Sequence, residues 1–111
     1  DGIMVWNRGG RQRDAACAPF DPLAEIVAAV GDKLDVICEG GIHRGTHMLK
    51  ALSLGAKAGA GGRLYLYALA AGGQAGVERA IGKYKAELER DMKLMGCNKI
   101  SDLSRNNLRF R

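Results

Sequence analysis

Long apolar runs, paired cysteines and aromatic residues are all scarce in this 111-residue sequence. No run reaches the roughly 18 apolar residues expected of a membrane-spanning helix. Cys17, Cys38 and Cys97 lie far apart without a Cys-x-x-Cys spacing, so they indicate neither a disulfide framework nor a zinc site. No secretory signal precedes Asp1, and we therefore expect a cytoplasmic protein. Aromatic residues make up only 5% of the chain, which leaves few rings for stacking on nucleic-acid bases.

The remaining composition is that of an ordinary globular protein, with 47% hydrophobic and 26% charged residues. Seventeen basic and twelve acidic side chains give a net charge of +5, which favours an anionic partner without identifying one. Part of this charge is arranged as oppositely charged i,i+4 pairs, such as Lys83 with Glu87 and Lys85 with Glu89. Pairs at this spacing are typical of the solvent-exposed face of a helix.

Three short segments have the pattern of strands in a parallel sheet. Residues 2–6 and 34–38 are mostly apolar and are followed by glycine-rich turns, which indicates strands buried on both faces. Residues 56–61 predict a weaker third strand, because Gly59 and Gly61 provide no side chain to pack.

Helical patterns follow each strand. Residues 21–31 begin with Asp-Pro, a favourable N-cap and first-turn pair, and end on a glycine; residues 46–54 predict a second helix. A long amphipathic helix is expected to end near Gly96, and a short one to cover residues 103–108. The apolar stripe of the long helix consists of Val77, Ile81, Tyr84, Leu88, Met92 and Met95.

Successive βα units predict a parallel sheet with right-handed crossovers, either open or closed into a barrel. In such folds ligands bind at the carboxyl ends of the strands. The first turn (residues 7–12), the second turn (residues 39–45) and the third turn (residues 61–63) each follow a predicted strand. We therefore expect the three turns to meet at one edge of the sheet.

All three turns combine glycines with arginines, which suits the binding of anions. Glycine allows backbone N–H groups to approach a phosphate, and a following arginine adds charge. Arg8 and Arg11 are suited to holding a carboxylate, although an exposed basic loop would have the same sequence. His43 and His47 have the i,i+4 spacing of metal ligands, but no third ligand accompanies them and no metal is expected.

Four motifs in order resemble the closing segments of the FMN-dependent 2-hydroxy-acid dehydrogenases and oxidases, a family that includes glycolate oxidase, flavin-type lactate dehydrogenase and mandelate dehydrogenase. The resemblance covers nearly the whole chain. The motifs are Asp-Gly-Ile-Met-Val-Trp-Asn-Arg-Gly-Gly-Arg-Gln at residues 1–12, Glu-Gly-Gly-Ile-His-Arg-Gly-Thr at 39–46, Leu-Lys-Ala-Leu-x-Leu-Gly-Ala at 49–56 and Gly-Arg-x-Tyr-Leu-Tyr at 62–67.

The resemblance implies a (β/α)8 TIM barrel with FMN across its C-terminal rim, a histidine that removes a proton from the substrate and an arginine that holds the substrate carboxylate. Arg11 falls on the position of that arginine. The family pattern places the implied FMN-binding positions at Glu39, Gly40, Gly41, His43, Arg44, Gly62 and Arg63.

The chain departs from the family pattern at several of these positions. The family's first turn reads Ser-Asn-His-Gly-Gly-Arg-Gln, so Arg8 stands at the place of the catalytic histidine and Trp6 replaces a serine. An arginine stays protonated and cannot act as a general base. Glu39 replaces an aspartate beside the flavin, His43 a phosphate-binding arginine, and Leu64 a proline. These exchanges suggest relaxed function, a decayed gene copy or an imperfectly determined sequence.

We therefore expect an α/β fold in which residues 1–111 are the C-terminal part of a single FMN-binding domain. This part would contain three βα units of the barrel and a long C-terminal helix. The chain has 111 residues, whereas a complete barrel takes roughly 250. We expect a longer, homo-oligomeric parent to oxidise a small 2-hydroxy acid to the 2-oxo acid, with this part inactive alone.

Two alternatives and two questions stay open. A non-catalytic remnant could bind phosphate or nucleic acid through its basic rim, and an exposed sheet edge could make the chain self-associate. The sequence indicates neither which hydroxy acid is oxidised nor which molecule accepts the electrons. The arginines of the basic rim are Arg8, Arg11, Arg13, Arg44 and Arg63.

Overall fold

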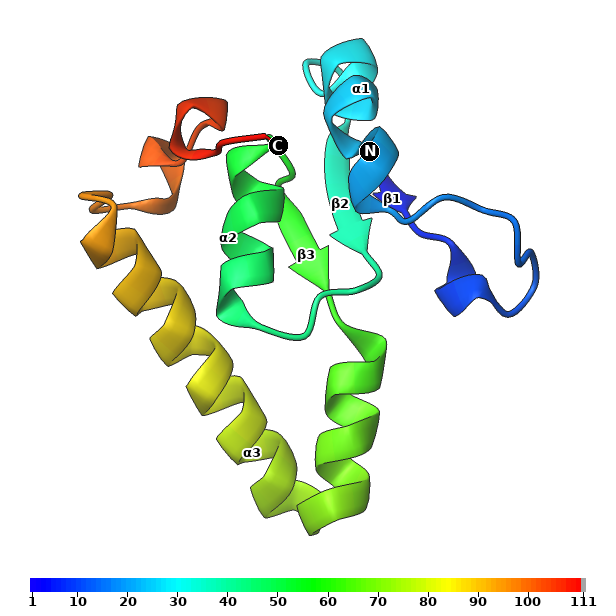
Figure 1. The fold of residues 1–111 in the computed structure, drawn as a ribbon, viewed down its shortest axis with the longest axis vertical. Coiled ribbons are helices and arrows are strands. Elements are labelled where there is room, and N and C mark those ends of the chain that lie inside the picture. Colours follow the sequence, from blue (N-terminus) through cyan, green and yellow to red (C-terminus); the bar gives the residue numbers. More distant parts are fainter. Residues whose placement is uncertain (111) are drawn as a thin grey trace.

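Three parallel strands form the centre of the protein. A computed structural model describes residues 1–110, and in its sheet the strands follow one another in chain order (Figure 1). Cys38 of the central strand lies opposite Val5 on one side and Gly59 on the other. All three strands therefore end at the same edge, as the βα order predicts. The strands are β1 (Gly2–Val5), β2 (Asp35–Glu39) and β3 (Ala58–Ala60).

The main hydrophobic core joins the central strand to helices α1 (Phe20–Val30) and α2 (Gly45–Ser53). Val36 and Cys38 are buried on β2, two residues apart, because alternate side chains of a strand share a face. Leu23 of α1 is fully buried, and burial of a leucine side chain contributes about 1.5–3 kcal/mol. The other buried members of this cluster are Val5, Ile42, Ala51 and Ala56.

Helix α2 packs on two neighbours at once. Ala51 belongs to the core beside the sheet, whereas Leu49 and Leu52 belong to a second cluster with Cys97 and Leu103 from the C-terminal segment. Because α2 packs on both sides, much of its surface is covered, and five of its nine residues are buried. The helix therefore connects the sheet to the C-terminal part of the chain.

Helix α3 (Gly62–Leu94) consists of two arms joined at a kink. Gly72 and Gly73 have non-helical dihedrals there, with φ +57° at Gly73. The first arm leads away from β3, and the second returns beside α2, as Figure 1 shows. The second arm confirms the predicted amphipathic helix. Within residues 1–110, no helix is both long and apolar enough to cross a membrane.

The first arm of α3, residues 62–71, is absent from the sequence prediction. Its residues from Leu64 onward are apolar or aromatic on every side, so no amphipathic period reveals them as helical. Such a helix is typically buried, yet several of its large side chains are exposed here. These exposed side chains are Tyr65, Leu66, Tyr67 and Leu69.

The C-terminal segment corrects another expectation. Instead of one helix over residues 103–108, the chain forms two 3-10 turns, Ile100–Asp102 and Arg105–Asn107. Asp102 and Asn107 accept hydrogen bonds from backbone N–H groups at the start of each turn, which favours short turns over a continuous helix. Buried Leu103 has extended backbone between them. Helix α1 also differs slightly, since it begins one residue before the predicted cap Asp21 and no side chain caps it.

Helices α2 and α3 pack closely together at Gly45. A Cβ atom at this position would lie 2.5 Å from both the Leu88 nitrogen and the Tyr84 oxygen, which are backbone atoms. We therefore expect Gly45→Ala to push the two helices apart and to reduce the free energy of unfolding by about 1–3 kcal/mol. Urea denaturation followed by circular dichroism measures this change.

Gly82→Ala is the matched control, because Gly82 lies in α3 and a Cβ there would meet no atom within 4 Å. Replacing an exposed helical glycine by alanine is expected to stabilise the protein by about 0.5–1 kcal/mol. Equal effects of the two substitutions would contradict the proposed close packing at Gly45.

Candidate functional site

The three turns meet around one cavity at the carboxyl edge of the sheet, as predicted. The cavity has a volume of about 500 Å³. Trp6 and the first turn up to Arg11 line one side, and the second turn lines it from Glu39 to His43. The third turn and the beginning of α3 complete the wall with Gly61, Gly62, Arg63 and Leu66.

The first turn is held in an unusual backbone conformation. Arg8, Gly9 and Gly10 have φ values of +55°, +66° and +74°, and Arg8 is the one non-glycine residue with positive φ in the described chain 1–110. A non-glycine residue in this region costs roughly 1–2 kcal/mol. The Asn7 side chain accepts a hydrogen bond from the Gly9 N–H at 3.0 Å, and Arg63 donates to the Gly9 carbonyl at 2.9 Å. These contacts stabilise the turn and connect it to α3.

Arg8 stacks on the neighbouring tryptophan. Its guanidinium carbon lies 5.1 Å from the centre of the Trp6 ring, within the range of a cation–π interaction. Both residues line the cavity, together with Arg11. The first turn therefore contributes two arginines to the cavity wall, one of them beside an aromatic ring.

The second turn places glycines where other residues would not fit. Gly40 has φ +114°, and a Cβ there would lie 2.7 Å from Cγ of Pro19. Gly41 has φ +74° and would meet no atom within 4 Å, so its backbone is open to a ligand. Glu39 points toward the third turn, with Oε1 3.6 Å from the position of a Cβ on Gly62.

The third turn is the N-terminus of α3. No side chain caps this helix at Gly61, and the first N–H groups of any helix lack intrahelical partners. Unpaired N–H groups and the helix dipole favour an anion at such an end. Arg63 adds a positive charge beside them, while the Glu39 carboxylate offers an acceptor from the neighbouring turn.

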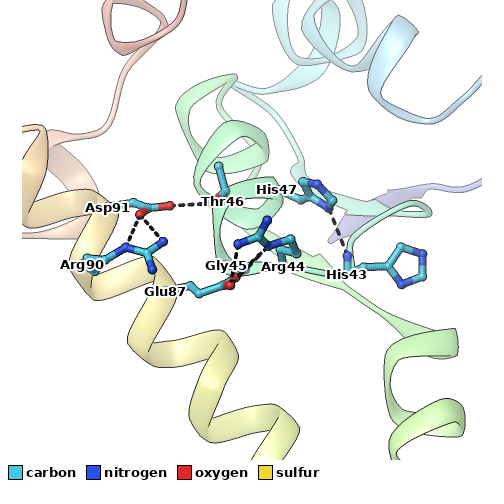
Figure 2. Close-up of polar contacts among 8 residues, drawn as sticks. All are labelled: His43, Arg44, Gly45, Thr46, His47, Glu87, Arg90 and Asp91. Atoms are coloured by element: carbon cyan, nitrogen blue, oxygen red, sulfur yellow. Dashed lines mark hydrogen bonds and ion pairs between the residues drawn. The ribbon is translucent and has the colours of Figure 1, made fainter.

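The two histidines do not form a metal site. His43 lines the cavity, whereas His47 uses Nδ1 to accept a hydrogen bond from the His43 backbone N–H at 3.2 Å (Figure 2). Among residues 1–110, no group of three His, Cys, Asp or Glu side chains is arranged to hold a metal ion.

Arg44 does not join the other predicted site residues at the cavity. Figure 2 shows its guanidinium directed at Glu87 of α3, where Nη2 and Nε donate to Oε1 at 2.8 and 3.2 Å. The other Glu87 oxygen accepts the Gly45 N–H at 2.9 Å. Thr46 donates to Asp91 at 2.6 Å, next to this pair. Arg44 therefore fastens the end of the second turn to α3.

Sequence reasoning missed part of the cavity wall. Asp14 and Phe20 line the cavity from the long segment after the first turn, and Leu66 lines it from the first arm of α3. Asp14 and Phe20 belong to none of the four motifs, and Leu66 lies in the motif of residues 62–67 without a polar group that would mark it. Only the position of Leu66 just after the Gly-Gly-Arg turn could have suggested its place.

Comparison with known proteins identifies similar chains. Residues 1–110 match the sequence profile of the family described as FMN-dependent dehydrogenase. An L-lactate oxidase from Nostoc sp. is 50% identical over 101 residues, which cover 91% of this chain and 28% of that protein. A peroxisomal (S)-2-hydroxyacid oxidase from Arabidopsis thaliana is 46% identical over 98% of this chain and 30% of its own length. The chain thus spans less than a third of these curated relatives.

Solved structures give the same result. A soluble mutant of the membrane-associated (S)-mandelate dehydrogenase from Pseudomonas putida superposes with a TM-score of 0.94 and 40% identity, over 100% of this chain and 31% of that one. The flavin-binding domain of baker's yeast flavocytochrome b2 gives a TM-score of 0.89 and 43% identity, over 96% of this chain and 28% of that one. These neighbours are TIM-barrel flavoenzymes, and the three βα units have the fold of part of such a barrel.

The contact between Arg44 and Glu87 predicts a pH dependence of stability. The hydrogen bond from Arg44 lowers the pKa of Glu87 below its ordinary value of 4.5, against the effect of burial. The hydrogen bond from Thr46 likewise lowers the pKa of Asp91 below 3.8. Folding lowers both pKa values, so the two ionised carboxylates stabilise the folded protein at pH values above their ordinary pKa. This stabilisation is lost as the pH falls through the pKa values of the folded state.

We expect the melting temperature to fall in acid below about pH 4.5, and Glu87→Gln to reduce this fall because it removes one of the two carboxylates. Scanning calorimetry between neutral and acidic pH measures this fall in melting temperature. Glu89→Gln is the control, since Glu89 forms only an exposed pair with Lys85 at 3.9 Å. The interpretation fails if Glu89→Gln changes the acid dependence as much as Glu87→Gln.

Proposed function

Because the chain belongs to the FMN-dependent dehydrogenase family, we propose that residues 1–111 are the C-terminal part of a single FMN-binding barrel domain. The cavity would hold the FMN phosphate at one end and the carboxylate of a small 2-hydroxy acid at the other. The observation that carries this proposal is the meeting of three glycine- and arginine-containing turns around one cavity of about 500 Å³. The parent enzyme would oxidise the 2-hydroxy acid to the 2-oxo acid.

The residues of the second and third turns fit the phosphate end of FMN. Gly41 leaves open space next to its backbone, and Gly62 and Arg63 begin a helix whose first N–H groups are uncapped. A phosphate group in this position would accept backbone N–H donors and lie beside a fixed positive charge. When bound, FMN supplies the electron-accepting ring. Glu39 and His43 would contact the cofactor from the same wall, whereas Arg44 would act through its pair with Glu87.

Arg11 fits the carboxylate end. Its planar guanidinium offers parallel N–H donors that match the two oxygens of a carboxylate. Arg8, at the position implied for the general base, cannot accept a proton at any working pH. Since general base catalysis contributes roughly 10²–10⁴-fold to a rate, we expect slow oxidation or none with Arg8 in place.

The first arm of α3 supports a longer parent. It is apolar on every side, and its exposed residues Tyr65, Leu66 and Tyr67 are 46%, 62% and 65% accessible. Exposed apolar area of this kind is usually covered in the assembled protein. In a complete barrel, other βα units would cover this arm and the free edges of β1 and β3.

A nucleic-acid-binding remnant is the less favoured reading. Arg44 pairs with Glu87, and Asp14 and Glu39 place negative charge in the wall of the cavity. The basic rim is therefore interrupted rather than continuous, which suits a small anion better than a long phosphate backbone.

A chimera tests the proposed function. We would replace the matching segment of the Pseudomonas putida (S)-mandelate dehydrogenase by this chain, because the two superpose over its whole length. The chimera is expected to purify with yellow flavin absorbance and to oxidise mandelate far more slowly than the unaltered mandelate dehydrogenase does. Arg8→His should raise its turnover roughly 10²–10⁴-fold by restoring a general base.

Arg105→His is the control for this exchange, because Arg105 is exposed and lies outside the cavity. It should leave the turnover of the chimera unchanged. A folded but colourless chimera would contradict FMN binding by these turns. A yellow chimera that Arg8→His does not activate would contradict the role assigned to position 8.

A further inference from the structure

Two departures from the family pattern contact each other in the first turn. Trp6 replaces a small serine and Arg8 replaces the implied histidine, and the two side chains stack at 5.1 Å. The backbone at Arg8 is held at φ +55° by the turn around it. Arg8 is exposed, but its backbone is held by the turn and its guanidinium lies over the Trp6 ring.

Stacking leaves the binding edge of Arg8 available. A cation–π contact occupies the face of a guanidinium, whereas its N–H donors lie in the plane of the group. Among residues 1–110, no hydrogen bond or ion pair engages the side chain of Arg8 or Arg11. By contrast, Arg63 donates to the Gly9 carbonyl.

Arg8 and Arg11 lie close together because they are the ends of one tight turn. The Arg11 N–H donates to the Arg8 carbonyl at 3.4 Å, and the ends of a four-residue turn have Cα atoms within about 7 Å. Both residues line the same cavity. Three arginines in its wall outnumber the two carboxylates, Asp14 and Glu39, and no ion pair in the described part of the chain neutralises either arginine of the first turn.

We propose that the Arg8–Arg11 pair binds a small dicarboxylate, one carboxylate on each guanidinium. The assignment of one carboxylate to Arg11 rests on the proposed function, and the second carboxylate is the new element. Arg8 replaces a proton acceptor by an anion-binding group, so the ligand is held without being deprotonated. The first turn thus selects a doubly charged ligand over a singly charged one.

Fluorescence of Trp6 provides a direct test, because it is the sole tryptophan of the chain and contacts Arg8. The chain would be titrated with malonate and with propionate at constant ionic strength. We expect malonate to bind roughly tenfold more tightly, since it alone can use both guanidinium groups. Arg8→Gln should bring the two affinities within about twofold, and Arg11→Gln should weaken both.

Two further variants separate binding from folding and from general charge. Arg105→Gln removes the other stacked arginine, which lies over Phe110 at 5.0 Å and outside the cavity, and should preserve the malonate preference. Arg8→Gln removes the fluorescence contact and Trp6→Ser removes the fluorophore, so the affinities of both variants would be measured by calorimetry, with circular dichroism as a check of folding. Trp6→Ser should weaken malonate binding less than Arg8→Gln does.

The inference is overturned if malonate binds no more tightly than propionate, or if Arg105→Gln reduces the preference as much as Arg8→Gln. Its failure is distinguishable from failure of the proposed function. If the chimera is yellow while the 111-residue chain shows no preference for malonate, only the proposed dicarboxylate site is contradicted. If the chimera is colourless while the 111-residue chain by itself prefers malonate, only the proposed binding of FMN is contradicted.

Discussion

Parallel pairing of the three strands is the constraint on which the candidate site depends. Because Cys38 lies opposite both Val5 and Gly59, the three strands end level with one another. Each turn then starts from the same edge of the sheet, and residues more than fifty positions apart reach one cavity. The hydrogen bond from Arg63 to the Gly9 carbonyl is a direct result, since it joins the third turn to the first.

The second constraint is the packing of α2 against α3. Gly45 allows the two backbones to approach, and Glu87 binds both the Gly45 N–H and the Arg44 guanidinium. This contact holds the end of the second turn, whose beginning is held by β2. An arginine that sequence resemblance implies at the cofactor is therefore used to fasten the wall of the cavity.

The shape of the first turn rests on its cap and its glycines. The Asn7 cap and the left-handed glycines depend on backbone geometry, which is independent of the side chain at position 8. A histidine and an arginine can therefore occupy the same turn with opposite consequences for proton transfer. Trp6 adds a stacking surface that suits an arginine in particular.

The βα order, the three turns, the second arm of α3 and the family could all be predicted before the structure, because apolar periodicity, glycines and motifs are local signals. Which arginines line the cavity follows only from the folded chain. Arg44 and Arg63 look alike in sequence, yet one pairs with Glu87 and the other reaches Gly9, since their partners are distant along the chain. The structure also revealed the first arm of α3, whose uniformly apolar sequence has no helical period, and the contact of Arg8 with the Trp6 ring. Side-chain direction depends on such distant neighbours, and no local pattern contains them.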